Sequence, residues 1–138
     1  HDADRPLYDN VAMQARSYGI PMESPPPPDR SWKEDDIVTL GAHRFRVVHL
    51  PGHAPGHVAL VGDEMVFVGD VIFAGSIGRT DLPLSDPAAM QRSLARIVAW
   101  TPGLVLHPGH GPSTTVAVEL QTNPFLAGVA RVRGAGVA

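Results

Sequence analysis

The segment HVALVGDEMVFVGD, residues 57–70, constrains the fold more than any other part of the chain. Two short apolar runs flank a Gly-Asp dipeptide at positions 62–63, which is typical of the tight turn of a β-hairpin. The second run ends in a further Gly-Asp pair, and this pair indicates the end of a strand. The segment therefore predicts two antiparallel strands with a loop beyond the second.

Further strands and helices are expected on either side of this hairpin. Residues 36–50 alternate polar and apolar side chains around a turn at Gly41, which predicts a second hairpin. LVLHP, residues 104–108, predicts a short buried strand. The expected helices cover residues 5–20, 86–100 and 114–121. Two hairpins followed by a helix, a strand and a helix predict an α/β or α+β class, with a layered sheet covered by helices.

The helix expected over residues 86–100 carries the clearest end signals. Asp86 is a typical N-cap residue and Pro87 a typical first helical residue. The apolar stripe expected along this helix comprises Met90, Leu94, Ile97 and Val98. The helix expected over residues 114–121 takes Ser113 or Thr114 as its cap.

Glycine and proline are unusually frequent, with 14 of each among 138 residues. Both lie between apolar runs, so they predict loops and turns rather than a low-complexity chain. Within residues 21–29, four consecutive prolines predict an extended spacer at the surface. The glycines of residues 71–85 predict a loop after the second hairpin.

Composition excludes several classes of protein. A length of 138 residues suits one domain, and 43% hydrophobic with 18% charged residues suits a globular core. A net charge of -3 argues against binding to nucleic acid, which needs a basic face. The absence of cysteine excludes disulfides, thiolate metal ligands and cysteine nucleophiles. No run reaches the length of a membrane span and no signal peptide is recognisable, so we expect no membrane partner and a cytoplasmic location.

Three residues share a pattern that is typical of a metal site. His53, Asp70 and His110 each follow an apolar strand, and each lies next to glycine. Loops at strand ends, held by a sheet, commonly carry functional groups, and imidazole with carboxylate suits zinc, iron or manganese. Each residue alone is more often a turn residue, a helix cap or a hydrogen-bonded histidine. Their spacing does not by itself prove that they converge, and HExxH, CxxC and P-loop motifs are absent.

The other histidines are expected to be structural. His57 either supports the loop that carries His53 or is itself a ligand, and we expect the supporting role. His49 and His107 lie on strands, where packing and hydrogen bonding are the usual roles of an imidazole. His43 is expected to be exposed in its turn.

Three segments together resemble the metallo-β-lactamase superfamily. LPGHAPGHVAL resembles the third metal motif of that family, VFVGDVIF the fourth and LHPGHGPST the fifth. FAGSIGRTDLP and TNPFL resemble elements of the glyoxalase II-like (hydroxyacylglutathione hydrolase-like) branch. The resemblance runs from His1 to about Leu126, and it implies the αββα sandwich of the family.

The chain also departs from the family in two places. The first metal motif, HxHxDH, is absent, so we expect residues 1–138 to form one domain that is incomplete at its N-terminus. This portion would be the C-terminal part of the sandwich. The sequence LSD at residues 84–86 stands where relatives have GGD, which changes the expected geometry of that loop.

The resemblance implies a mechanism with two divalent metal ions, of which zinc is the leading choice and iron or manganese the alternatives. His53 would bind the first metal, His110 the second, and Asp70 would bridge both as the catalytic carboxylate. A metal-bound hydroxide would then attack an acyl carbonyl. His57 would support the ligands. Arg79 would bind an anionic, glutathione-type group, or would instead pair with Asp81.

Three functions remain open on the sequence. The leading hypothesis is a metal-dependent thioester hydrolase of the glyoxalase II-like kind, whose substrate is a small acyl thioester, including glutathione-linked ones. The second is a persulfide dioxygenase of the same fold with a single iron. The third is a truncated, non-catalytic fragment. The acyl group and the oligomeric state are not determined by the sequence.

Overall fold

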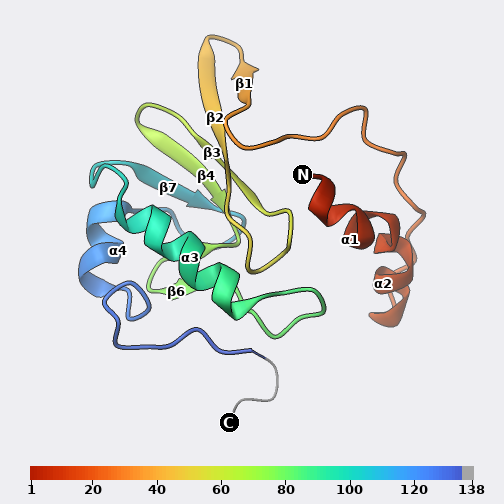
Figure 1. The fold of residues 1–138 in the computed structure, drawn as a ribbon. Coiled ribbons are helices and arrows are strands. Elements are labelled where there is room, and N and C mark those ends of the chain that lie inside the picture. The colour runs from red at the N-terminus through yellow and green to blue at the C-terminus, as the bar shows by residue number, and fades with distance from the viewer. Residues whose placement is uncertain (135–138) are drawn as a thin grey trace.

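A mixed six-stranded sheet forms the centre of the computed structural model, which describes residues 1–134 (Figure 1). Its strands lie in the order β1-β2-β3-β4-β7-β8. Their bounds are β1 Ile37–Leu40, β2 His43–His49, β3 Val58–Val61, β4 Met65–Gly69, β7 Val105–Pro108 and β8 Thr114–Thr115. A separate two-stranded ribbon, β5 Ile72–Phe73 with β6 Ser76–Ile77, follows β4. The expected α/β layered class is confirmed.

Both predicted hairpins are present at the expected positions. β1 pairs with β2 and β3 pairs with β4, in each case antiparallel. Gly41 adopts a positive φ of 60° at the first turn, which favours glycine. In the second turn, the Gly62 amide donates a hydrogen bond of 2.9 Å to the Met65 carbonyl. The local turn chemistry therefore determines both connections.

The pairing of β4 with β7 decides where the loops meet. These two strands are parallel, and the helix α3, Pro87–Val98, lies between them in the chain. Parallel strands end at the same edge of a sheet, so the loops after β4 and β7 emerge together. β2 is antiparallel to β3, which is antiparallel to β4, so β2 ends at this same edge. Three separate segments are thus brought to one end of the sheet.

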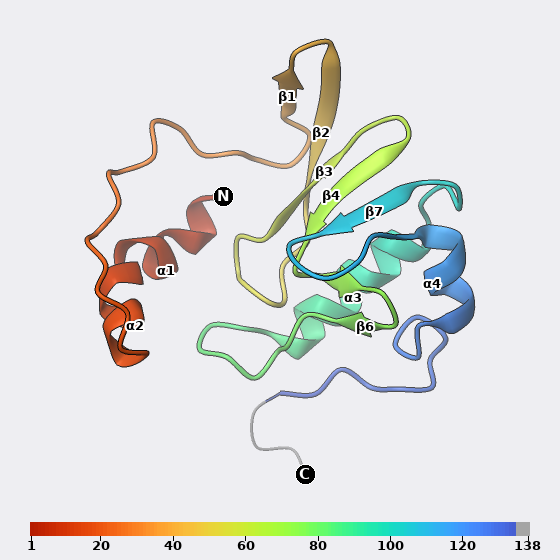
Figure 2. The same cartoon turned by 180° about the vertical axis from the view of Figure 1, so that it is seen from behind.

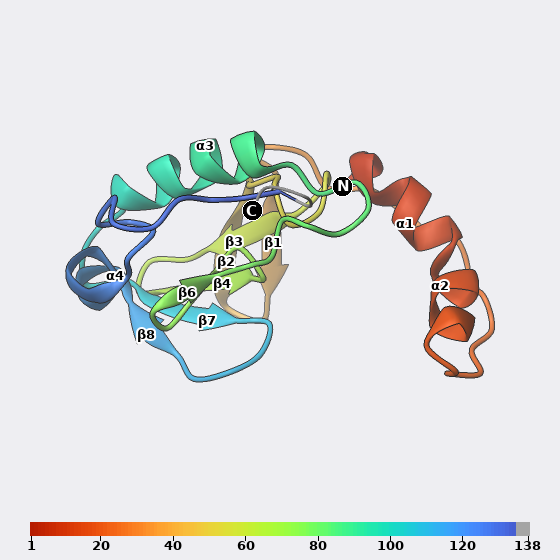
Figure 3. The ribbon, with the colours of Figure 1, turned by 90° about the horizontal axis from the view of Figure 1, so that it is seen from below.

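Helix α3 covers one face of the sheet, as Figure 3 shows. Asp86 caps it by accepting from the amides of Ala88 and Ala89, as predicted. The fully or almost fully buried side chains between α3 and the sheet include Met90, Leu94, Ile97, Val48, Val66, Val68 and Leu106. Val98 was expected in this apolar stripe but is 44% exposed. It is the last residue of α3, and a 100° step from Ile97 turns it away from the core.

The second expected helix begins later than predicted. Thr114 and Thr115 form the short strand β8, and α4 covers Val116–Thr122. Thr115 is the N-cap, and its hydroxyl accepts a hydrogen bond from the Val118 amide. The cap is therefore neither Ser113 nor Thr114. Two successive β-branched residues favour extended backbone, and pairing with β7 stabilises it.

The helix expected over residues 5–20 is divided into shorter pieces. These are the helices α1, Arg5–Asp9, and α2, Val11–Ser17, and the 3-10 turn η1, Asp2–Asp4, precedes them. The helix is interrupted at Asn10, whose side-chain amide nitrogen donates a hydrogen bond of 2.8 Å to the Pro6 carbonyl. Gly19, with φ of 71°, ends the second helix as predicted. Figures 2 and 3 show that α1 and α2 stand beside the sheet rather than over it.

Residues 71–85 were predicted to form a loop, but they contain the paired strands β5 and β6, joined by a turn at Gly75 with φ of 70°. The proline-rich segment behaves as the sequence indicated. Residues 21–29 contain neither helix nor strand, and they connect α2 to the sheet along the surface. Leu84, which stands where a glycine is expected from the family, adopts a left-handed φ of 67°. The LSD loop therefore keeps a conformation that glycine adopts at lower cost. Among the helices of residues 1–134, none has the length and apolar character needed to cross a membrane.

Candidate metal site

The structure brings His53, Asp70 and His110 together at the common edge of the sheet. They lie on the loops after β2, β4 and β7. Nε2 of His53 is 3.7 Å from Oδ2 of Asp70, and Nε2 of His110 is 4.0 Å from the same oxygen. One carboxylate oxygen is therefore approached by two imidazoles from different loops.

The ring of His53 is oriented by a backbone contact. Its Nδ1 lies 2.9 Å from the carbonyl oxygen of Arg79. A carbonyl only accepts hydrogen bonds, so Nδ1 carries the proton and Nε2 presents a lone pair toward Asp70. This is the arrangement commonly found at metal-binding histidines, in which the other ring nitrogen donates to a carbonyl or carboxylate.

His57 supports the loop of Asp70 from beneath. Its Nε2 accepts a hydrogen bond of 2.9 Å from the Asp70 amide. Burial lowers the pKa of His57 to about 4, and the nearby His53 adds to this effect. The ring is thus neutral near pH 7 and its proton lies on Nδ1, which is buried without a hydrogen-bond partner among residues 1–134. The geometry matches the supporting role expected for His57 rather than a place among the converging donors.

Glycines allow the loops to approach one another closely. Gly69 has a positive φ of 55°, and a Cβ there would lie 2.6 Å from Nε2 of His57. A Cβ on Gly109 would collide with Oδ1 of Asp70. The Gly109 amide also donates to the Gly69 carbonyl at 3.1 Å, which ties the loop after β7 to the end of β4. Contact distance therefore requires glycine at positions 69 and 109.

The N-terminal segment contacts the loop between β2 and β3, although the two are distant in sequence. Oδ1 of Asp4 accepts a hydrogen bond of 2.6 Å from the Gly56 amide. The rings of His1 and His49 stack with centroids 4.1 Å apart, and Nε2 of His49 lies 2.8 Å from the Pro55 carbonyl. The sequence contains no signal for the contacts of Asp4 with Gly56 and of His1 with His49, which join residues separated by about fifty positions.

A cleft of about 560 Å³ opens beside these donors. Phe73, Ala74 and Ile77 supply its apolar walls, while His53, Asp70 and His110 lie within its lining. The ring of Phe73 stacks on the ring of His110, with centroids 4.4 Å apart and planes 27° apart. The cleft thus joins the candidate donors to an apolar wall.

Arg79 lines the cleft, but its guanidinium has a partner. It forms a bidentate ion pair with Asp81, with distances of 2.6 Å and 2.8 Å. The hydrogen bonds that Arg79 donates to Asp81 are also the main reason why the pKa of Arg79 is raised. The pairing that the sequence offered as an alternative is present. Any role of Arg79 toward an anionic substrate requires that this exposed pair opens or is shared.

Sequence reasoning missed two buried polar residues on α4 and at its end. Glu119 and Asn123 are fully buried, and Oε2 of Glu119 accepts from the Asn123 amide at 2.8 Å. The helical spacing held a signal, since Glu119 follows the buried Val116 by three positions and precedes Asn123 by four. The segment TNPFL was noted, but the role of its asparagine was not.

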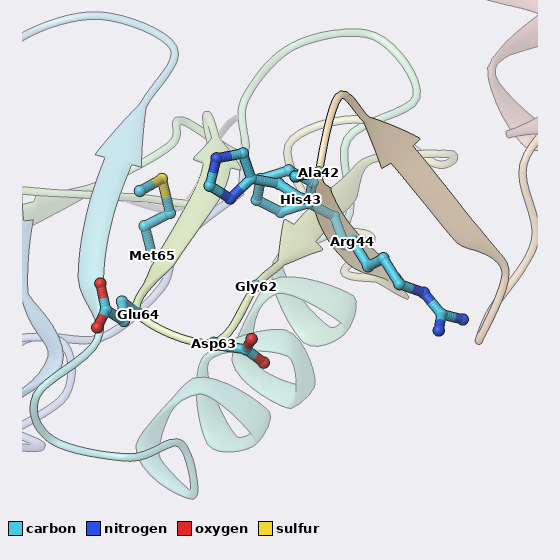
Figure 4. A pocket seen from close by; sticks show the side chains of 8 residues that line it. Ala42, His43, Arg44, Gly62, Asp63, Glu64 and Met65 are labelled. Atoms are coloured by element: carbon cyan, nitrogen blue, oxygen red, sulfur yellow. The ribbon is translucent and has the colours of Figure 1, made fainter.

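A second hollow, of about 370 Å³, lies at the opposite end of β4 (Figure 4). It is lined by the turns before β2 and between β3 and β4, and it includes His43, Arg44, Asp63 and Glu64. Figure 4 shows the carboxylates of Asp63 and Glu64 directed apart and the guanidinium of Arg44 directed away from both. These groups do not converge. His43 is exposed, as predicted.

The chemistry of the donor set fits metal binding at the cleft. His53 and Asp70 face each other on one side, and His110 and Asp70 on the other. Within residues 1–134, no three donors close around a single cation position. Imidazole and carboxylate donors on loops at the edge of a layered α/β sheet are typical of metal-dependent proteins.

Comparison with known proteins identifies the family. Residues 1–120 match the metallo-beta-lactamase superfamily, and the chain belongs to this superfamily. The hydroxyacylglutathione hydrolase GloC of Haemophilus influenzae is 35% identical over 130 residues, which are 91% of this chain and 61% of GloC. A probable metallo-hydrolase, YqgX of Bacillus subtilis, is 39% identical over 106 residues, which are 74% of this chain and 50% of that protein.

Solved structures support the same assignment. TTHA1623, crystallised in a di-iron-bound form, has a TM-score of 0.82 and 47% identity, with 91% of this chain and 63% of that chain covered. The B3 metallo-beta-lactamase BLEG-1 has a TM-score of 0.81 and 34% identity with the same coverage. The chain therefore spans about half to three fifths of the length of these relatives.

Proposed function

We propose that the protein is a metal-dependent hydrolase of the glyoxalase II-like kind, which cleaves a small acyl thioester. The observation that carries this proposal is the approach of His53 and His110 to one oxygen of Asp70, at 3.7 Å and 4.0 Å. The similarity to the hydroxyacylglutathione hydrolase GloC supports the substrate class. A glutathione thioester also fits the cytoplasm, where the glutathione pool keeps thiols reduced.

The proposal assigns His53 to one divalent cation, His110 to a second, and Asp70 to both. Such a pair of cations supplies a water nucleophile at neutral pH and polarises the carbonyl that is attacked. Each cation would receive one histidine and one carboxylate oxygen from these donors, so each would need further ligands besides those described within residues 1–134. The absent HxHxDH motif has the residue types that are needed.

The residues of this chain would each have a separate task. The Arg79 carbonyl holds His53 with Nε2 free, and His57 holds the backbone of Asp70. The apolar wall formed by Phe73 and Ile77 would exclude water from one side of the acyl group. A thiolate is a good leaving group, so the mechanism needs no strong general acid among these residues.

The same donors limit which metal ions can bind. Two imidazoles and a carboxylate suit zinc, iron and manganese. Zinc is the commonest choice for hydrolysis with such ligands, while the di-iron form of TTHA1623 supports iron in a related structure. We propose two divalent ions, with zinc first and iron or manganese as alternatives.

Metal content, measured element by element on the purified protein, tests the proposal together with hydrolysis of an acyl-glutathione. About two divalent ions per chain and thioester cleavage are expected. One iron per chain without cleavage would instead indicate the single-iron persulfide dioxygenase of this fold. A protein that binds no metal would be a non-catalytic fragment. A β-lactam assayed in parallel separates a thioesterase from a lactamase.

A further inference from the structure

We infer that Glu119 and Asn123 are positioning residues for the half of the site that contains His110. They hold the ribbon β5–β6, and the ribbon holds Phe73 against the imidazole of His110. The inference rests on the proposed two-metal function only for its metal readout, because the contacts themselves belong to the chain alone.

Glu119 is a fully buried carboxylate whose hydrogen bonds all lie within the protein. Oε2 accepts from the Gly75 amide at 2.9 Å and from the Asn123 side chain at 2.8 Å. Oε1 accepts from the Thr114 hydroxyl at 2.6 Å. Burial of a carboxylate is costly unless its oxygens accept hydrogen bonds, as those of Glu119 do. One of the donors, Gly75, lies in the turn between β5 and β6. Glu119 therefore attaches α4 and β8 to the tip of the β5–β6 ribbon.

Asn123 attaches the same ribbon from its other side. Its Nδ2 donates to the Ser76 carbonyl at 2.9 Å and has a longer contact of 3.4 Å with the Phe73 carbonyl. Its Oδ1 accepts from the Phe125 amide at 3.1 Å. All polar atoms of this fully buried amide thus have partners, and two of those partners are on β5 and β6.

His110 needs external support because it lacks the backbone bond that orients His53. Its side chain is 74% exposed, whereas that of His53 is 22% exposed. Among residues 1–134, the contacts described for the ring of His110 are the stack on Phe73 and the approach to Asp70. The orientation of His110 therefore depends on the position of Phe73, which the buried pair determines.

Two nearly isosteric substitutions test the pair in opposite directions. Asn123→Asp replaces a donating NH₂ by an oxygen that faces two carbonyls and the Glu119 carboxylate, so the ribbon should move. Glu119→Gln keeps an acceptor for Gly75 and Asn123, and the Thr114 hydroxyl can turn to accept from the new amide. The first substitution should disrupt the site and the second should preserve it.

The readout is the chemical shift of the His110 ring protons in the metal-free protein. Stacking on Phe73 should shift them upfield relative to Phe73→Leu, which removes the ring and sets the zero point. Asn123→Asp is expected to lose this shift, and Glu119→Gln to retain it. Thr122→Val is the matched control on α4, because within residues 1–134 the hydrogen bond described for the Thr122 hydroxyl goes to the Val118 carbonyl of its own helix. It should leave the shift unchanged.

Titration with Co²⁺ supplies the second readout. Asn123→Asp and Phe73→Leu should weaken the cation held by His110 about tenfold or more, the usual effect of groups that orient ligands, while the other cation is retained. Equal loss of both cations, or a His110 shift that survives Asn123→Asp, would overturn the inference. A protein that shows the expected shifts yet cleaves no thioester would refute the proposed function and leave the positioning role intact.

Discussion

The two ends of strand β4 carry similar side chains in opposite arrangements. At the end marked by Gly69, His53, Asp70 and His110 approach one another within 4.0 Å. At the end marked by Met65, the hollow of Figure 4 has a histidine, an arginine and two carboxylates that point apart. Both ends have charged or titratable groups near a cleft, but at only one end do these groups converge.

The difference lies in what holds the side chains. His53 is oriented by a carbonyl, and Asp70 has its backbone held by His57. His43 is the exposed first residue of β2, rather than a turn residue as predicted, and a tilted contact with Phe45 at 6.5 Å is the ring contact described for it. A cluster of titratable residues becomes a candidate metal site when the backbone and buried neighbours fix the orientation of each side chain. Only then do the lone pairs point toward the same cation position.

Asp70→Ala should have the largest effect. Removal of the shared carboxylate should abolish the second cation and reduce thioester hydrolysis by more than about 100-fold, beyond the range of merely supporting residues. The fold should remain, because Asp70 lies at a strand end, and the free energy of unfolding should change by about 1 kcal/mol or less. Metal analysis, kinetics and urea unfolding measure these effects.

His43→Ala, at the other end of β4, is the control for Asp70→Ala. It should leave metal content and hydrolysis unchanged. If Asp70→Ala unfolds the protein while metal remains bound, Asp70 is structural and the comparison of the two ends is wrong.

Gly109→Ala should weaken metal binding about 10- to 100-fold, because the added methyl group collides with Oδ1 of Asp70 and displaces it. Gly103→Ala is matched to it, since a Cβ there meets nothing within 4 Å. That substitution should change the free energy of unfolding by about 0.5 kcal/mol or less. Titration of both variants with Zn²⁺ compares them, and equal affinities would mean that the close approach of Gly109 is unimportant.

His57→Ala should weaken metal affinity about tenfold, because the Asp70 amide loses the acceptor that fixes its loop. His57→Gln offers a carbonyl oxygen at a similar reach and should recover part of the affinity. Calorimetric titration measures both. If His57→Ala leaves the metal affinity unchanged, His57 contributes to packing and not to metal binding.

The smallest effect is expected for the contact that ties the end of β2 to α3. Arg96 bonds both the His49 carbonyl, at 2.8 Å, and Glu34, at 2.5 Å. Burial raises the pKa of Glu34, but the bonds from Arg96 and the His49 amide outweigh it and lower the pKa below 4.5. A lowered carboxyl pKa contributes stability above the unfolded value, and this contribution is lost as the pH falls below about 4.5.

Glu34→Gln should therefore lower the free energy of unfolding slightly at pH 7, and its difference from the unaltered protein should vanish as the pH falls below about 4.5. Urea unfolding between pH 3 and pH 7 compares it with Asp9→Asn, whose ion pair with Arg5 lies on α1 and does not touch the sheet. Identical pH profiles for Glu34→Gln and the unaltered protein would show that this pair does not hold the end of β2.

Much of the fold was predictable because its signals are local. The Gly-Asp turn at 62–63, the cap formed by Asp86 and the stop at Gly19 act within a few residues, and all three were predicted. The three candidate donors were also selected from local context, since glycine and a strand end adjoin each, and their role as metal ligands stays a prediction. Errors arose where a neighbour outside the segment competed, as for Val98 and for the threonines that pair with β7.

The sequence by itself determined the strands, the turns, the class of fold and the residue types available for a metal site. Only the tertiary structure decided that β4 and β7 run parallel, so that Asp70 and His110 emerge at one edge. It also decided that Arg79 orients His53 through its carbonyl and that Asn123 holds the ribbon of Phe73. These contacts join residues 26 or more positions apart, and no local propensity encodes them, because their free energy comes from packing and burial of the whole chain.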